Sequence, residues 1–148
     1  MFTFRTATPE DVPALLGFWA TAAENTSRPQ DSAPAVENLL QRDPDALILA
    51  LDPTDEQIVG SVIAGFDGWR CHLYRLAVAP DRRRQGIATA LIDHAEARFR
   101  ALGGTRSDAM VLDDNVSAQS AWWARGYRVQ EEWSRWIRPL ADDGRPQR

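Results

Sequence analysis

In the N-terminal quarter of the chain, hydrophobic residues recur first with the period of a strand and then with that of a helix. Phe2–Thr6 alternates with the period of two that is typical of a β-strand. Apolar residues at helical spacing follow and predict a helix to about residue 24, with Thr8 as its N-cap and Pro9 in its first turn. A second, shorter helix is expected over residues 34–41, because the Asp43-Pro44 pair disfavours further helix.

Three successive strands are predicted in the middle of the chain. Ala46–Leu51 is almost continuously apolar, as in a strand covered on both faces. A polar turn at residues 52–56 leads into a second strand over 58–66. Asp67-Gly68 forms the next turn, and a third strand is expected over residues 70–78.

The last third of the chain predicts two more helices, each followed by a strand. A long helix is expected over residues 85–102, where Gly103-Gly104 ends it. A strand over 108–112, a helix over 116–125 and a final strand from Gly126 to Ile137 complete the pattern. The predicted order is therefore β-α-α-β-β-β-α-β-α-β.

Length and composition indicate one domain without a membrane span. A chain of 148 residues fits a single domain, expected over residues 1–138 with a frayed polar tail at 139–148. No apolar stretch reaches the length of a transmembrane helix, and no signal-peptide pattern is evident. One cysteine, Cys71, excludes an intrachain disulfide, so a reducing, cytoplasmic location is expected. The net charge of −4 argues against nucleic acid or an anionic membrane as a partner.

The segment from residue 76 to residue 89 carries the clearest chemical signal. A predicted strand ends at Val78, Pro80 stops its pairing, and two small residues, Gly86 and Ala88, open the long helix. Unpaired N–H groups and the positive end of the helix dipole lie at such a terminus, which favours an anion there. The alternative is that Gly86 only eases a tight turn beside a solvated basic loop. Neither a Walker-type nor a Rossmann glycine pattern is present.

Two motifs in this order resemble the GNAT N-acetyltransferases. The first is Arg83-x-x-Gly86-x-Ala88 after the strand at residues 76–78, and the second is Asn115-x-x-Ala118, then Trp122, then Gly126-Tyr127. The resemblance covers about residues 2–137 and is greatest to small bacterial members of undefined substrate. It implies a mixed α/β (α+β) GNAT fold, with a mostly antiparallel central sheet of about six strands flanked by four helices.

The resemblance also implies acetyl-CoA as the co-substrate and places it on the chain. Its pyrophosphate would lie against backbone amides and one hydroxyl in the turn: Arg83, Arg84, Gln85, Gly86, Ile87, Ala88 and Thr89. The pantetheine arm would pair with the strand end Leu76, Ala77 and Val78, and the Val78 N–H would act as the oxyanion donor. Asn115 would bond the arm or a bridging water, although a helix N-cap is an equally good reading of this residue. Trp122 stands where relatives commonly have a tyrosine that protonates the leaving thiolate, which tryptophan cannot do.

The reaction that the resemblance implies is direct attack of a primary amine on the thioester, without a covalent enzyme intermediate and without a metal. His72 is the candidate base, although a hydrogen-bonded structural histidine is the commoner role on a strand. Tyr74 and Tyr127 are the candidate acids, and Tyr74 is preferred because Tyr127 is expected to pack at the start of the last strand. The acceptor would be a small-molecule or protein amine, and a homodimer is left open. Because Trp122 departs from the usual pattern, a non-catalytic acyl-CoA sensor or partner-binding module is the alternative function.

Overall fold

A five-stranded sheet with the strand order β1-β2-β3-β4-β5 organises the computed structural model, which describes residues 1–23 and 28–140. The strands are β1 Thr3–Thr6, β2 Leu47–Leu51, β3 Ile58–Phe66, β4 Cys71–Val78 and β5 Ser107–Ala109. The helices are α1 Val12–Ala22, α2 Ala33–Arg42, α3 Ile87–Ala101 and α4 Val116–Ala124, with 3-10 turns at Pro9–Asp11 and Pro80–Arg82. Strands β1 to β4 pair antiparallel with one another, whereas β5 pairs parallel with β4. No helix in the described part of the chain is long and apolar enough to cross a membrane.

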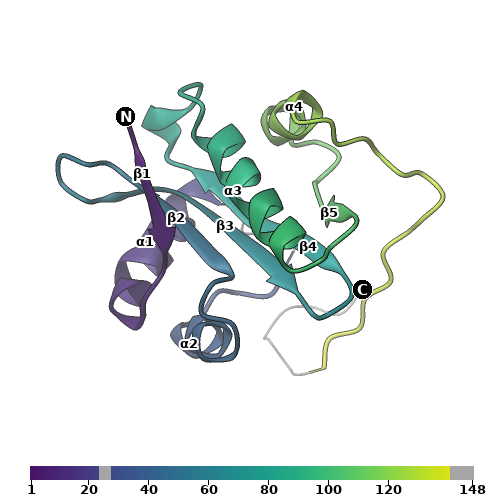
Figure 1. Ribbon diagram of the computed structural model, residues 1–148, viewed down its shortest axis with the longest axis horizontal. Helices are drawn as coiled ribbons and strands as arrows, with labels where there is room; N and C mark the ends of the chain where they lie inside the picture. Colours follow the sequence, from purple (N-terminus) through teal and green to yellow (C-terminus); the bar gives the residue numbers. More distant parts are fainter. Residues whose placement is uncertain (24–27, 141–148) are drawn as a thin grey trace.

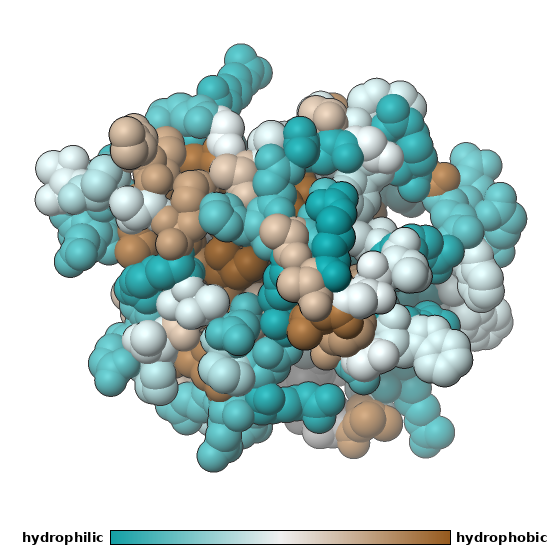
Figure 2. Space-filling view, viewed as in Figure 1, coloured by the Kyte–Doolittle hydropathy of each residue, from teal (hydrophilic) through white to brown (hydrophobic). Residues whose placement is uncertain are grey.

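Helices cover both faces of this sheet and create two hydrophobic cores. The core on the α3 face includes Leu91, Ile92 and Phe99, and the core on the other face includes Leu15 and Trp19 of α1. Figure 1 shows α3 lying across one face, with α1 and α2 behind the other. Seen from the same side, hydrophobic side chains gather in the left half of the molecule, where β1 and β2 lie beside α3 (Figure 2). The apolar run in the middle of the chain is therefore explained, because every residue of β2 is buried.

Local signals place the helix starts where the sequence predicts them. The Thr8 N–H donates to Asp11 Oδ2 (2.8 Å), which closes the turn before α1. The Ala35 N–H donates to Ser32 Oγ (3.2 Å) at the start of α2. The Ala118 N–H donates to Asn115 Oδ1 (3.1 Å), which confirms Asn115 as the N-cap of α4.

The expectation of about six strands is wrong by one, because the final strand over residues 126–137 is not formed in the described structure. Trp133 and Trp136 are 73% and 93% exposed. Two features account for the missing strand. In a strand, Trp133 and Trp136 would face opposite sides of the sheet, so one face could not bury both. The neighbouring strand β5 is only three residues long, so its edge offers few pairing partners. Within the expected tail at 139–148, residues 141–148 lie outside the described residues.

The Arg5–Asp11 ion pair should make the stability of the N-terminal turn depend on pH. Two hydrogen bonds from Arg5 (2.7 and 2.9 Å), together with the Thr8 N–H, lower the pKa of Asp11 to about 2. Because the folded-state pKa lies below the ordinary value of 3.8, the stabilisation is present above about pH 4 and is lost as pH falls toward 2. We therefore expect Asp11→Asn to lower the urea midpoint at pH 6, and to lower it progressively less between pH 4 and 2. An equal deficit at both ends of this range would contradict the assignment.

Candidate active site

The sheet opens along one side of β4. Strand β5 pairs with β4 only at Cys71, His72 and Leu73, so the rest of β4 has a described pairing partner on its β3 side alone. The Ala79 N–H donates to Val59 O (2.9 Å) and therefore faces β3. Because successive N–H groups of an extended strand point to alternate sides, the Val78 and Leu76 N–H groups point toward the open edge.

A β-bulge at Arg75 marks the point where the edge opens. Between the pairs Ile63↔Tyr74 and Ser61↔Ala77, β4 contains one residue more than β3. The chain accommodates the extra residue at Arg75, whose backbone lies in the left-handed region with φ of 55°. Such bulges interrupt pairing and redirect side chains, and here the bulge lies directly before the two outward-facing amides.

The loop after β4 leads into the N-terminus of α3. Gly86 caps the helix in the left-handed conformation (φ 81°), and Arg84 has a positive φ as well (65°). The first backbone bond of the helix runs from the Ala90 N–H to Gly86 O (3.0 Å), so the N–H groups of the three preceding residues have no partner within the helix. A Cβ built at Gly86 would meet nothing within 4 Å, so the chain leaves open space beside the cap of the helix.

One ion pair holds the basic loop, and the residues that follow it are exposed. Arg82 is tied back to Asp52 (2.7 Å), which anchors the loop to the β2–β3 turn. Arg83, Arg84 and Gln85 are exposed around the helix end. The expected turn residues therefore form one surface in which backbone donors, the helix dipole and two arginine side chains all favour an anion.

His72 forms a dyad with a residue that the sequence did not predict. Its Nδ1 lies 2.7 Å from Asp108 Oδ1, and the two residues are partners in the parallel β4–β5 register. Both side chains are less than half exposed (44% and 43%). Cys71 and Leu73 pack into the core beneath α3, so the dyad faces the α1 and α2 side of the sheet. The reading of His72 as a hydrogen-bonded strand histidine is confirmed, and this same bond would orient an imidazole that acts as a base.

Tyr74 lies on the same face as His72, two residues along β4, which is a spacing of about 7 Å. Its side chain is 45% exposed and passes close to Gly65 of β3. Partial burial, and to a lesser degree the Asp43 charge, raises the pKa of the Tyr74 phenol above its ordinary value. The phenol therefore remains protonated at neutral pH and can donate a proton.

A strand edge with outward-facing amides beside an open helix N-terminus is the arrangement that the two sequence motifs imply. The model of the acetyltransferase (GNAT) family matches residues 14–127, most of the chain. The chain belongs to this family. An acetyltransferase of Pectobacterium atrosepticum is 37% identical over 107 residues, which are 72% of this chain and 73% of the relative.

Solved structures agree with the fold of this GNAT acetyltransferase. Ard1 from Thermoplasma volcanium superimposes with a TM-score of 0.74 at 18% identity, over 87% of this chain and 84% of the other. The ribosomal-protein-S18-alanine N-acetyltransferase of Escherichia coli gives a TM-score of 0.68 at 19% identity, over 85% and 77%. Membership of the GNAT family makes the chain an acetyltransferase and implies acetyl-CoA as its donor.

Two residues of the second motif are held inside the GNAT domain. Trp122 is 7% exposed and packs edge-on against the Tyr127 ring, with centroids 5.0 Å apart. Asn115 uses its side-chain oxygen to cap α4. Both residues thus have a structural role that is independent of a ligand, and their contact with the donor remains a prediction.

Cys71 is a packing residue of the acetyltransferase. It is 1% exposed, and burial raises the pKa of its thiol, so little thiolate forms at neutral pH. A Cβ at Gly104 would lie 2.4 Å from the Cys71 sulfur, which shows how closely the chain covers this thiol. This burial argues against Cys71 as a nucleophile.

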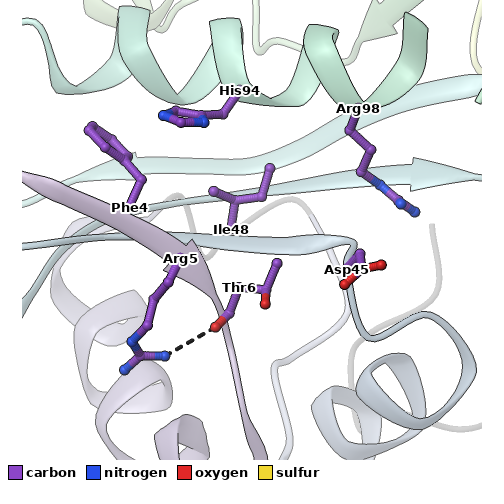
Figure 3. A pocket seen from close by; sticks show the side chains of 7 residues that line it. All are labelled: Phe4, Arg5, Thr6, Asp45, Ile48, His94 and Arg98. Carbon is purple, nitrogen blue, oxygen red and sulfur yellow. Dashed lines mark hydrogen bonds between the residues drawn. The ribbon is translucent and has the colours of Figure 1, made fainter. Parts of the chain in front are cut away.

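Two cavities of the acetyltransferase lie away from the open edge. One, of about 240 Å³, lies between β1 and α3, where the rings of Phe4 and His94 are 4.6 Å apart (Figure 3). The other, of about 390 Å³, lies beyond the C-terminal end of α3, where the Tyr127 hydroxyl bonds Glu96 and Ser107. Neither includes a residue expected to bind the donor, so the candidate site is the open edge and helix end.

Proposed function

We propose that this protein transfers the acetyl group of acetyl-CoA to a primary amine by direct attack of the amine on the thioester. The observation that carries the proposal is the junction of the open β4 edge with the N-terminus of α3. The β4 edge supplies backbone donors for an extended arm, and the N-terminus of α3 supplies an anion site. Both lie within one continuous stretch of chain from Leu76 to Thr89.

The residues present suit acetyl-CoA, which supplies an activated acetyl thioester. The amides of Ile87, Ala88 and the Thr89 hydroxyl would hold the pyrophosphate, with Arg83 and Arg84 beside it. The backbone of residues 76–78 would pair with the pantetheine arm as an added strand. The Val78 N–H, which points to the open edge, would stabilise negative charge that develops on the thioester oxygen.

His72 and Tyr74 are the groups that would handle protons. His72, oriented by Asp108, lies six residues from Val78 along β4, about 20 Å away, so it would accept a proton from the amine through a chain of water molecules. Tyr74, which lies between His72 and the Val78 amide along β4, would give its proton to the departing thiolate. This assignment provides an acid although Trp122 cannot act as one.

The acceptor is proposed to be a cationic amine. Asp108 and Asp67 interact with His72, and Asp43 lies near enough to Tyr74 to affect its titration. Asp43 is ion-paired with Arg98, so Asp108 and Asp67 are the carboxylates that favour a positively charged acceptor over an anionic one. Steady-state acetylation of a panel of monoamines, polyamines and peptide N-termini, followed by release of free CoA thiol, tests the function. Acetyl-CoA binding without turnover across this panel would contradict it.

Tyr74→Phe should separate proton donation from binding. We expect kcat to fall by roughly 10- to 100-fold, because general acids contribute on the order of 10² to 10⁴ and a CoA thiolate is already a fair leaving group. The affinity for acetyl-CoA should remain unchanged, since the ring that passes Gly65 is retained. Stopped-flow thiol release with the best amine of the panel measures the chemical step. An unchanged kcat in Tyr74→Phe would assign proton donation to water.

A further inference from the structure

A buried series of hydrogen bonds holds the bulge of β4 from the α1 side of the sheet. The Trp19 indole N–H donates to Ser61 Oγ (2.8 Å), and the Ser61 hydroxyl donates to the Arg75 carbonyl (2.9 Å). Trp19 is 2% exposed and Ser61 is fully buried. A buried serine of this kind specifies one geometry, because moving the Arg75 carbonyl would leave two polar groups unpaired.

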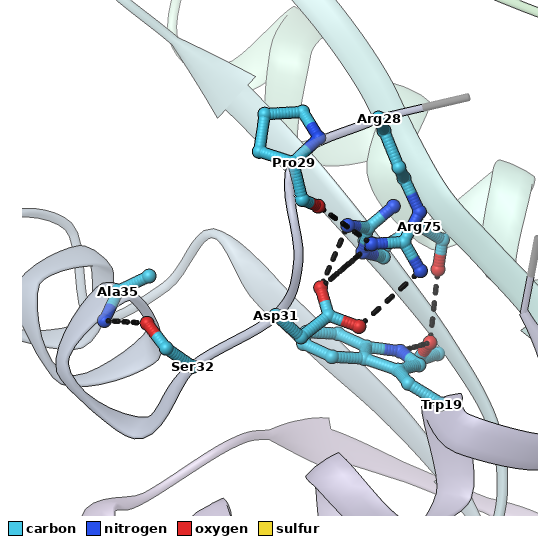
Figure 4. Close-up of polar contacts among 8 residues, drawn as sticks. Trp19, Arg28, Pro29, Asp31, Ser32, Ala35 and Arg75 are labelled. Carbon is cyan, nitrogen blue, oxygen red and sulfur yellow. Dashed lines mark hydrogen bonds and ion pairs between the residues drawn. The ribbon is translucent and has the colours of Figure 1, made fainter. Parts of the chain in front are cut away.

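The Arg75 side chain is fixed as well. Its guanidinium lies over the Trp19 ring at 5.5 Å from the ring centroid, and its Nε and Nη2 donate to Asp31 Oδ1 (3.0 and 2.6 Å). Arg28 also donates to both Asp31 oxygens (3.0 and 3.2 Å). Figure 4 shows the two guanidinium groups meeting above Asp31, with the Trp19 indole beneath them.

This arrangement joins two parts of the site that are distant in sequence. Asp31 immediately precedes Ser32, which caps α2, so it belongs to the connection between α1 and α2. Arg75 belongs to β4, directly before the two outward-facing amides. The side chains of Arg28, Asp31 and Arg75 are all 14–17% exposed, so their electrostatic interactions are only weakly screened by solvent.

We propose that Trp19, Ser61 and Asp31 are positioning residues for acetyl-CoA: they hold Arg75 in its bulged conformation and thereby aim the Leu76 and Val78 amides at the donor. Through the Asp31–Arg75 ion pair, occupation of the β4 edge also stabilises residues 28–32 before α2. This inference rests on the proposed function, because it takes the open edge as the donor site. It adds that donor affinity is set partly by residues that never touch the donor.

Ser61→Ala tests the backbone half of this proposal. We expect acetyl-CoA to bind roughly tenfold more weakly, because the Arg75 carbonyl loses its buried partner and the bulge relaxes. Titration calorimetry with acetyl-CoA gives the affinity, and urea unfolding gives the stability. Val36→Ala is the matched control, since it removes buried volume from the same core without contacting the bulge and should lower stability alone. Equal affinity in Ser61→Ala and wild type would overturn the proposal.

A pair of substitutions at Arg75 isolates backbone geometry from side-chain contact. Both Arg75→Gly and Arg75→Ala lose the guanidinium, but only glycine adopts the positive φ without cost. Arg75→Gly should therefore bind acetyl-CoA several-fold more tightly than Arg75→Ala. Equal affinities would show that the bulge does not aim the amides.

Hydrogen exchange separates this proposal from the proposed function. Without ligand, the Ala77 amide, which faces Ser61 of β3, should exchange faster in Ser61→Ala than in wild type or Val36→Ala. With acetyl-CoA, peptides covering residues 28–40 should gain protection in wild type and not in Asp31→Asn. Failure of wild type to bind acetyl-CoA would contradict the proposed function, whereas unaltered exchange of the Ala77 amide in Ser61→Ala would contradict only the positioning role.

Discussion

Gly86→Asp should abolish acetyl-CoA binding while leaving the fold intact. The residue caps α3 in front of the open amides, so a carboxylate there would occupy the anion site and repel the pyrophosphate. We expect at least a 100-fold loss of affinity, since like charges brought together in such a site cost several kcal/mol. Aspartate is itself a favourable N-cap residue, which offsets part of the cost of the positive φ, so α3 should still form. Isothermal titration with acetyl-CoA and far-ultraviolet circular dichroism measure the two effects.

Gly103→Asp provides the matched control at the other end of the same helix. Gly103 also has a positive φ (87°), and a Cβ there would also meet nothing within 4 Å. This variant therefore carries the same backbone strain and the same added charge, and it should bind acetyl-CoA as wild type does. Gly86→Asn separates bulk from charge and should lose less affinity than Gly86→Asp. Equal affinity in Gly86→Asp and Gly103→Asp would show that the α3 N-terminus does not hold the pyrophosphate.

The elements that sequence reasoning predicts well are those whose pattern is local. The apolar run before residue 52 and the turn at 52–56 define β2 and β3, and β3 spans residues 58–66 as expected. Capping by Thr8 and Asn115 also depends on atoms only three residues away. Strand β5 is less predictable, because its length depends on how far it can follow β4 before the two separate. The same non-local dependence explains the missing strand after Tyr127.

The same contrast between local and non-local features holds in the candidate site. The helix end at Gly86 is visible in the sequence, since small residues, a preceding strand and basic neighbours lie within one short segment. Asp108 is not visible, because only the parallel register of β5 on β4 brings it to His72. The bulge at Arg75 is equally hidden: a left-handed arginine gives no sequence signal, and its anchors Ser61 and Asp31 lie 14 and 44 residues away.

Asp108 therefore offers a sharper test of the chemistry than the residues that sequence reasoning selected. Because a carboxylate bonded to Nδ1 fixes the tautomer and orientation of an imidazole, Asp108→Asn should lower kcat by roughly 10- to 100-fold. His72→Gln should lower it by at least as much, on the order of 10²-fold or more. Neither change should alter acetyl-CoA affinity, since the dyad lies at the opposite end of β4 from the Val78 amide.

The pH dependence of kcat decides whether the dyad acts on protons or only supports the sheet. An imidazole acts as a base only in its neutral form, so a His72 that takes the proton of the amine should give the pH–rate profile an acidic limb. That acidic limb should disappear in His72→Gln, because glutamine cannot take up a proton. Asp113→Asn, which removes an exposed charge beyond β5, is the control and should leave the profile unchanged. The contrary result is that His72→Gln lowers stability while keeping both the wild-type kcat and the wild-type pH profile. That result would show that the amine loses its proton to water and that the dyad only holds β5 against β4.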